Sequence, residues 1–241
     1  MTRKILVVLT SYGPDSTPGG WYLPEFAHPY DEFTAAGYQV TVASPAGGEA
    51  PLDPGSVQMW EEDPSSKEFR KTPKLWEETE KISAYLGRAD EFDALFYPGG
   101  HGPMFDLVSN ADSQQLIAEF ESKGKIVASV CHGPAAFLHV TRQSTGRPLL
   151  EGLDVTGFSN EEENAIGTAD AMPFKLEDEL EKVALGVVKL DPKAPRKKFK
   201  KNDKIFEPKV VTVGKVITGQ NPVSARVVAQ EIVKALGELM P

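Results

Sequence analysis

The chain has 241 residues, of which 40% are hydrophobic and 25% charged, with one cysteine and a formal net charge of -9 at pH 7. A single cysteine excludes an intramolecular disulfide, and the negative charge disfavours binding to a phosphate backbone. No apolar run approaches the ~20 residues of a membrane span, and no cleavage site follows the short run Ile5 to Leu9. We therefore expect a cytoplasmic protein with no nucleic-acid or membrane partner.

Short apolar runs alternate with amphipathic stretches along the chain. Strands are expected, in chain order, at Ile5–Ser11, Tyr38–Ser44, Phe92–Tyr97, Lys125–Val130, Val155–Phe158, Lys209–Val213 and Val216–Thr218. Helices are expected at Glu25–Ala36, Leu75–Leu86, Ser113–Ser122 and Val223–Leu239, with a further helix beginning near Gly133. The alternation predicts a flavodoxin-like, doubly wound α/β fold, in which helices cover both faces of a mostly parallel sheet.

The composition is uniform enough to predict one domain over residues 1–241. Within it, residues 45–74 are rich in glycine, proline and acidic residues, which predicts a surface insertion. Residues 185–206 form a lysine-rich, extended connection. We interpret its basic cluster as a solvated loop rather than as a localisation or nucleic-acid signal.

In open parallel sheets the active crevice lies beyond the carboxyl ends of the strands. Four stretches are expected to meet there: Ser11–Glu25, Pro98–Pro103, Cys131–Pro134 and Ser159–Asn164.

Cys131 follows an expected strand and stands at a glycine-containing turn that opens a helix. This pattern is typical of a nucleophile elbow, and a helix N-terminus lowers the pKa of a thiol. The sequence therefore predicts a reactive thiolate, with a buried structural cysteine as the alternative. His132 could exchange a proton with the thiol near pH 7.

Gly99 and Gly100 follow the strand expected beside the Cys131 strand. Glycines let backbone amides approach a ligand closely, so these two are predicted to form an oxyanion hole. The G-x-G-x-x-G spacing of a dinucleotide loop is absent. A simple tight turn is the remaining alternative.

Glu25 stands at the start of the first expected helix. A carboxylate at this position commonly does no more than stabilise the N-terminus of the helix. Beside an anionic sulfur, however, it could be protonated and donate a hydrogen bond. The acidic residues 161–163 are either a solvated helix start or supply a third group that orients His132. His28 and His101 also fall in crevice segments, but without metal-ligand spacing, so no metal site is expected.

Five segments together carry a family resemblance: Gly20-Trp21-Tyr22-Leu23-Pro24-Glu25, Tyr97-Pro98-Gly99-Gly100-His101-Gly102, Cys131-His132-Gly133-Pro134-Ala135, Gly157-Phe158 and Thr218-Gly219-Gln220-Asn221-Pro222. In this combination the chain resembles the PfpI superfamily of the glutamine-amidotransferase-like fold. Within it, the chain is most similar to the glutathione-independent glyoxalases (glyoxalase III), which are also known as heat-shock chaperones.

The resemblance implies that Cys131 is the nucleophile, His132 its partner and Glu25 a proton-sharing acid. It also implies a third triad member, for which Glu163 has the best spacing and Glu161 and Glu162 are close rivals. The implied activity converts a small reactive aldehyde, methylglyoxal, to lactate without glutathione or another cofactor. The implied assembly is a homodimer.

Two other functions stay open at this point. One is a stress-response protein, either a holdase chaperone with an exposed apolar patch or a protein deglycase. The other is a cysteine peptidase or amidase, since the superfamily includes both.

Overall fold

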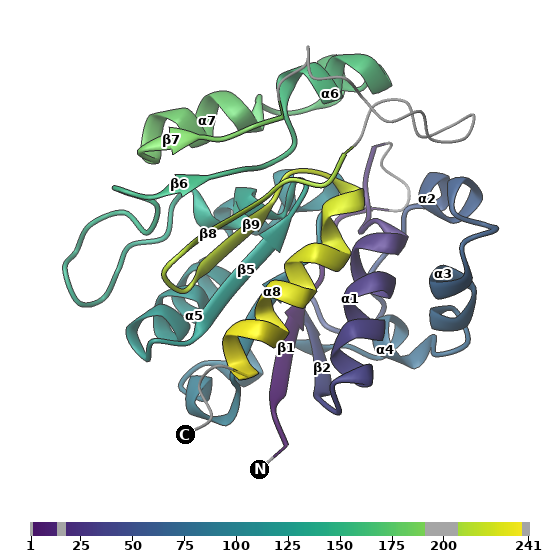
Figure 1. The fold of residues 1–241 in the computed structure, drawn as a ribbon, viewed down its shortest axis with the longest axis horizontal. Helices are drawn as coiled ribbons and strands as arrows, with labels where there is room; N and C mark the ends of the chain where they lie inside the picture. The colour runs from purple at the N-terminus through teal and green to yellow at the C-terminus, as the bar shows by residue number, and fades with distance from the viewer. Residues whose placement is uncertain (1, 14–17, 191–206, 238–241) are drawn as a thin grey trace.

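The computed structural model describes residues 2–13, 18–190 and 207–237 (Figure 1). Its main sheet has seven strands in the order β3-β2-β1-β4-β5-β9-β8. Their bounds are β1 Lys4–Val8, β2 Gln39–Ser44, β3 Glu80–Lys81, β4 Ala94–Tyr97, β5 Ile126–Val130, β8 Val210–Val213 and β9 Val216–Gly219. All neighbouring strands are parallel except β8 and β9. The predicted flavodoxin-like, mostly parallel sheet is confirmed.

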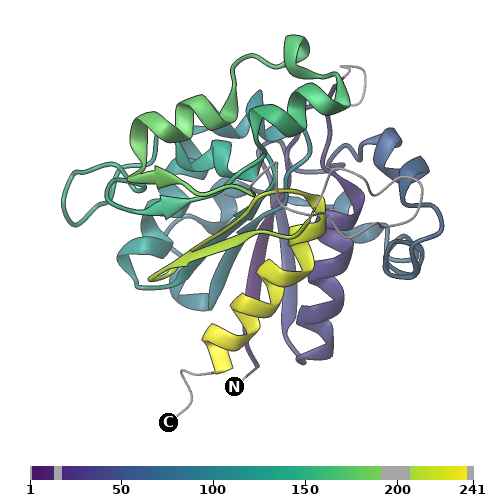
Figure 2. The ribbon, with the colours of Figure 1, turned by 45° about the horizontal axis from the view of Figure 1, so that its top comes forward.

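Helices lie on both sides of this sheet (Figures 1 and 2). The α-helices are α1 Leu23–Ala35, α2 Pro54–Met59, α3 Pro64–Phe69, α4 Lys74–Glu77, α5 Ala111–Ser122, α6 Asn160–Ile166, α7 Leu176–Val183 and α8 Ala225–Gly237. The 3-10 helices are η1 Ile82–Tyr85, η2 Ala89–Glu91, η3 Gly102–Met104, η4 Leu107–Ser109, η5 Gly133–Phe137, η6 Ala169–Ala171 and η7 Pro222–Ser224. Helices α1 and α8 pack side by side on one face, and α5 lies against β4 and β5 on the other. No helix in the described part of the chain is long and apolar enough to cross a membrane.

The central strands consist mainly of buried apolar residues because both faces of the sheet are covered. In β1, residues 5–8 are fully buried, and every residue of β5 is buried as well. A strand with one solvated face would instead alternate apolar and polar residues. These mainly apolar runs are the reason that the central strands could be predicted.

The prediction of a helix at Leu75–Leu86 is wrong. Helix α4 ends at Glu77, and the chain then forms β3, which pairs with β2, before η1 begins. Thr79 exchanges two backbone hydrogen bonds with Gly48, at 2.7 and 3.0 Å. Pairing with a distant segment therefore overrides the local helical spacing of apolar residues.

Two further expectations near the crevice need correction. The helix expected near Gly133 is the five-residue 3-10 helix η5. The strand expected at Val155–Phe158 is shorter: β6 covers Asp154–Val155 and pairs with β7 (Gly186–Val187) in a separate two-stranded ladder. Phe158, which was expected in the same strand, instead binds the turn at Cys131: its amide donates a hydrogen bond to the Cys131 carbonyl oxygen at 2.9 Å.

The segment 45–74, expected as a surface insertion, contains α2 and α3, and α3 packs against α1. Trp21 is fully buried at this junction, with its ring edge-on to Phe26, Phe69 and Trp76. Of the lysine-rich connection expected at 185–206, residues 191–206 lie outside the described part of the chain.

The start of α6 is tied to the end of β9 by the buried carboxylate of Glu162. Oε2 of Glu162 accepts hydrogen bonds from the Ser159 amide at 3.0 Å, the Ser159 hydroxyl at 2.8 Å and Gln220 Nε2 at 2.9 Å. Oε1 accepts one from Asn221 Nδ2 at 2.8 Å. Because Glu163 is the next residue, this network also sets where the Glu163 side chain begins.

Glu162→Ala should lower the free energy of unfolding by roughly 3 kcal/mol or more, because it leaves buried donors without an acceptor. Denaturant unfolding measures the effect. Glu161→Ala, at the exposed neighbouring position, is the matched control and should change the free energy by less than about 1 kcal/mol. Equal effects of the two substitutions would contradict the proposed anchoring role of Glu162.

Candidate active site

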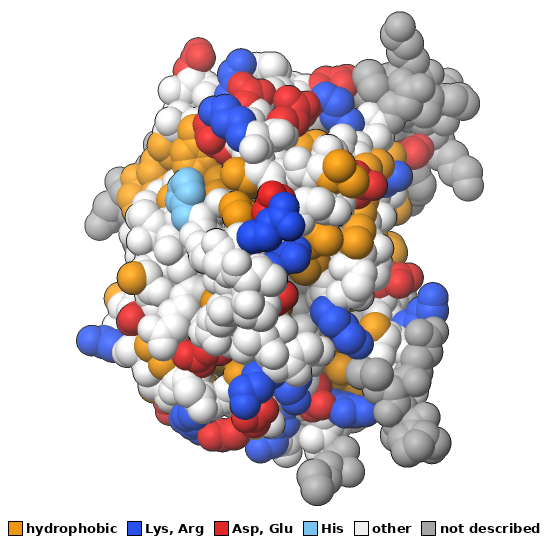
Figure 3. Space-filling view, turned by 90° about the vertical axis from the view of Figure 1, so that its left-hand side faces the viewer, with side chains coloured by type: hydrophobic (Ala, Val, Ile, Leu, Met, Phe, Trp, Pro, Cys, Tyr) orange, Lys and Arg blue, Asp and Glu red, His pale blue; other side chains and the backbone are white. Residues whose placement is uncertain are grey.

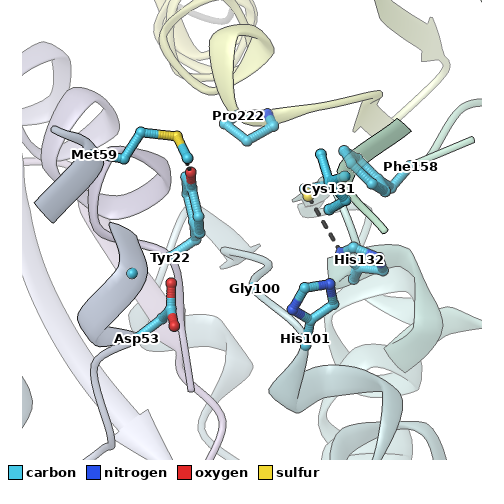
Figure 4. Close-up of a pocket in the computed structure, with 11 residues that line it drawn as sticks. Tyr22, Asp53, Met59, Gly100, His101, Cys131, His132, Phe158 and Pro222 are labelled. Atoms are coloured by element: carbon cyan, nitrogen blue, oxygen red, sulfur yellow. Dashed lines mark hydrogen bonds between the residues drawn. The ribbon is translucent and has the colours of Figure 1, made fainter. Parts of the chain in front are cut away.

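A cavity of about 170 Å³ opens beyond the carboxyl ends of the central strands (Figure 4). Its lining residues are Tyr22, Asp53, Gly55, Met59, Gly100, His101, Cys131, His132, Phe158, Ile166 and Pro222. The segments expected at the crevice around residues 22, 100 and 131 do meet here. Cys131, His132 and His101 lie on one side of the cavity, facing Tyr22 and Met59 on the other (Figure 4).

Cys131 has a left-handed backbone with φ of 60°, and no other described non-glycine residue has a positive φ. Such a conformation costs on the order of 1–3 kcal/mol and persists only where surrounding contacts impose it. Here the Cys131 amide donates to the Gly219 carbonyl oxygen at 2.9 Å, and the Cys131 carbonyl accepts from the Phe158 amide. A Cβ at Gly133 would lie 2.5 Å from the Tyr97 carbonyl oxygen, so the turn also requires glycine there. The sharp turn expected of a nucleophile elbow is present.

Cys131, His132 and Glu163 form a continuous chain of contacts. Sγ of Cys131 lies 3.3 Å from Nδ1 of His132, and Nε2 of His132 lies 2.6 Å from Oε2 of Glu163. Of the three consecutive glutamates, Glu163 is thus the one that reaches the imidazole. Glu162 serves the anchoring network described above, and Glu161 is exposed.

Glu163 is shared by a second imidazole, which was not predicted. His101 Nε2 lies 3.3 Å from Oε1 of Glu163, and the Thr168 hydroxyl donates to the same oxygen. The rings of His101 and His132 lie 4.7 Å apart between centroids. Burial alone would raise the pKa of Glu163, but hydrogen bonds from both imidazoles and Thr168 outweigh it and hold this pKa well below its usual range. Glu163 is therefore ionised, and both histidines donate to it through Nε2–H.

Glu25 lies completely buried in the first turn of α1. Its Oε2 accepts a hydrogen bond from the Gly99 amide at 2.8 Å. Its Oε1 makes no hydrogen bond of standard geometry, but the carboxyl lies close enough to the Cys131 thiol to affect the pKa of both groups. Burial raises the pKa of Glu25 from 4.5 to about 8, and the nearby Cys131 thiol and the hydrogen bond from the Gly99 amide offset this rise only in part. The carboxyl is therefore protonated at neutral pH.

The expectation that the helix N-terminus lowers the pKa of Cys131 is wrong for this structure. Burial raises the pKa of the Cys131 thiol well above its usual range, and the carboxyl groups of Glu25, Glu162 and Glu163 add to the effect. Only the short 3-10 helix η5 follows the cysteine, so few aligned peptide dipoles oppose this shift. The thiol consequently needs a base at the moment of attack.

The two glycines predicted for an oxyanion hole differ in their surroundings. The Gly99 amide is already bound to Glu25, so it is not available to a ligand. Gly100 lines the cavity, and its amide makes no hydrogen bond to another described residue. The same holds for the His132 amide, whereas that of Cys131 is bound to Gly219. The amides of Gly100 and His132 are the available donors.

Among the described residues, His101, His132 and Glu163 form the group whose ligand atoms could surround a metal ion, since these atoms all lie within 4.8 Å of one another. The hydrogen bonds within the group account for this proximity. We therefore assign no metal ligands.

Some lining residues had no signal in the sequence. Met59, from the expected insertion, and Ile166, from the end of α6, complete the wall of the cavity. For His101, its place in the motif Gly99-Gly100-His101-Gly102 was a signal, but only the fold brings it to Glu163.

The fold and the site define a flavodoxin-like α/β protein with a cysteine–histidine–glutamate triad at the carboxyl end of a parallel sheet. The chain belongs to the DJ-1/PfpI family, whose model matches residues 20–165.

Three similar proteins match the chain over almost its full length. The glutathione-independent glyoxalase HSP31 of Saccharomyces cerevisiae is 30% identical, covering 97% of this chain and 98% of that protein. The crystal structure of glyoxalase III from Candida albicans matches with a TM-score of 0.81 and 29% identity, covering 97% of each chain. The Rapid Encystment Protein of Francisella tularensis matches with a TM-score of 0.85 and 29% identity, covering 98% of this chain and 99% of that one.

Glu25→Gln should lower the pKa of Cys131, because Glu25 loses its own proton at about pH 8, below the pH at which this buried thiol ionises, and the variant removes that negative charge while keeping the shape of the carboxyl. The rate of alkylation by iodoacetamide against pH measures this pKa. Glu161→Gln is the control and should leave the profile unchanged. A midpoint that stays the same or rises in Glu25→Gln would show that Glu25 does not act on the thiol in this way.

Glu25 should also make stability depend on pH. Since its pKa is raised from 4.5 to about 8 in the folded protein, its contribution is present below pH 4.5 and is lost as the pH rises toward 8. The free energy of unfolding of wild type should therefore fall relative to that of Glu25→Gln across this window. Denaturant titrations at several pH values test this, and a constant difference between the two proteins would refute it.

Proposed function

We propose that the protein is a glutathione-independent glyoxalase that converts methylglyoxal to lactate. The observation that carries the proposal is the contact of 3.3 Å between Sγ of Cys131 and Nδ1 of His132, at the floor of a small cavity. The names of the yeast relatives described above support the same activity.

The reaction begins with attack of Cys131 on the aldehyde carbon. Because the resting thiol is protonated, Nδ1 of His132 takes its proton as the bond between sulfur and carbon forms. Glu163, ionised and hydrogen-bonded to Nε2, stabilises the resulting imidazolium. The alkoxide of the hemithioacetal accepts hydrogen bonds from the amides of Gly100 and His132.

The hemithioacetal then isomerises. Loss of the proton from the former aldehyde carbon gives an enediol, and protonation of the neighbouring carbon gives a thioester. Oxidation of the first carbon is balanced by reduction of the second, so the step requires no external electron acceptor. Water then hydrolyses the thioester, which releases lactate and the Cys131 thiol.

The walls of the cavity favour a small substrate with an apolar substituent. Tyr22, Met59, Phe158, Ile166 and Pro222 surround the polar floor. A methyl group loses unfavourable contact with water against such a wall. A volume of about 170 Å³ suits a small molecule better than the extended peptide that a peptidase must hold.

A holdase chaperone receives less support. Among the described residues, three large hydrophobic side chains are exposed: Met59, Ile166 and Leu185. Two of them belong to the cavity wall. On the face seen in Figure 3, charged side chains separate the apolar areas. A holdase would need a larger continuous patch.

Wild type should form lactate from methylglyoxal without added thiol, and Cys131→Ser should form none above background. Glu163→Gln removes the charge that supports the imidazolium, so its turnover should fall by roughly 10²-fold or more. Lactate is measured by an enzymatic assay or by NMR, with Glu161→Gln as the control at near-wild-type turnover. Lactate formation by Cys131→Ser at the wild-type rate would refute the proposal.

A further inference from the structure

His101 has the same relation to Glu163 that His132 has, but it faces a different part of the site. Both imidazoles bind the carboxylate through Nε2, one at Oε1 and the other at Oε2. Nδ1 of His132 then lies against the Cys131 sulfur. Nδ1 of His101 has no hydrogen-bond partner among the described residues, and the ring lines the cavity beside Cys131 (Figure 4).

This arrangement leaves His101 with a basic nitrogen directed to the substrate space. Glu163 accepts a hydrogen bond from Nε2–H of His101, so Nδ1 of the neutral imidazole carries a free lone pair. The side chain of His101 is 18% exposed, compared with 2% for His132. A small molecule attached to Cys131 would therefore meet this nitrogen inside the cavity.

The other polar groups of the site are already committed when the hemithioacetal has formed. His132 has taken the thiol proton and can no longer act as a base. Glu25 is protonated, and it holds the Gly99 amide with its second oxygen. The Tyr22 hydroxyl lies 3.1 Å from the Met59 sulfur, and Asp53 caps α2 on the far wall (Figure 4).

We propose that His101 is the base that moves the carbon-bound proton in the isomerisation, an assignment that rests on the proposed glyoxalase function. Nδ1 of His101 accepts the proton from the former aldehyde carbon, whose electron pair forms the double bond of the enediol while the neighbouring carbonyl oxygen gains a proton from the His132 imidazolium. The His101 imidazolium then returns its proton to the neighbouring carbon, and the oxygen on the first carbon, which has remained an alkoxide since the attack, becomes the thioester carbonyl. Each proton lost is regained, so the step is an isomerisation.

Two histidines that share one carboxylate then have different roles. His132 exchanges protons with the thiol and the substrate oxygen, while His101 moves the proton between the two carbons. Because Glu163 is hydrogen-bonded to both rings, it can stabilise whichever imidazole carries the positive charge.

His101→Ala and His101→Gln test the assignment, and the glutamine of the second variant retains a donor for Glu163. Both variants should alkylate at Cys131 at close to the wild-type rate, since the Cys131–His132 pair stays intact. Lactate formation should nonetheless fall by roughly 10²-fold or more, the usual scale for loss of a general base. His139→Gln, an exposed histidine, is the matched control and should keep wild-type turnover.

Two readouts separate a catalytic from a structural role. Free imidazole should restore part of the turnover of His101→Ala, because the substitution leaves space for it beside the substrate. With methylglyoxal deuterated at the aldehyde carbon, the isotope effect on turnover should increase in His101→Gln, because cleavage of the carbon–hydrogen bond then limits the rate.

The outcomes are distinguishable. Turnover of His101→Gln within a few-fold of wild type, or a parallel loss of alkylation and turnover in both variants, would overturn the assignment and leave the glyoxalase function standing. A loss of turnover with neither imidazole rescue nor an increased isotope effect would also overturn it. Absence of lactate with wild type would instead overturn the proposed function, and this assignment with it.

Discussion

The left-handed backbone at Cys131 is the constraint on which the site depends. In a regular strand or helix, the side chains of residues 131 and 132 would point in different directions and could not contact each other. The positive φ lets the His132 ring turn back to within 3.3 Å of Sγ. The conformation is held from both sides, by Gly219 at the end of β9 and by Phe158 beyond β6. Hydrogen bonds to two segments that are distant in the sequence thus hold the strained turn in place.

Three buried carboxyl groups raise the pKa of Cys131, and each has a different role because its surroundings differ. Glu25 has few donors and stays protonated at neutral pH. Glu163 has three donors and stays ionised. Glu162 binds the segments on which Glu163 depends. Separation of carboxyl groups by environment is a common way for one site to hold both an acid and an anion.

The sheet was largely predictable because its central strands are buried on both faces. The runs at 5–8 and 126–130 are buried throughout, and Ser129 is their one polar residue, so neither has the polar face of an amphipathic helix. The errors fall where tertiary contacts compete with local spacing. At 75–86 the apolar spacing fits a helix, but Thr79 forms a bridge with Gly48, and β3 pairs with β2 at the edge of the sheet instead.

The sequence by itself determined the fold class, the turn that carries Cys131 and the short set of segments around it. These properties are local, since they depend on apolar runs and on glycines at particular positions. Tertiary structure alone decided which of three consecutive glutamates reaches His132, because that depends on how α6 is anchored. It also brought His101 to Glu163, 62 residues further along the chain. Finally, it reversed the expected shift in the pKa of Cys131, because burial and nearby carboxyl groups outweigh the dipole of one short helix.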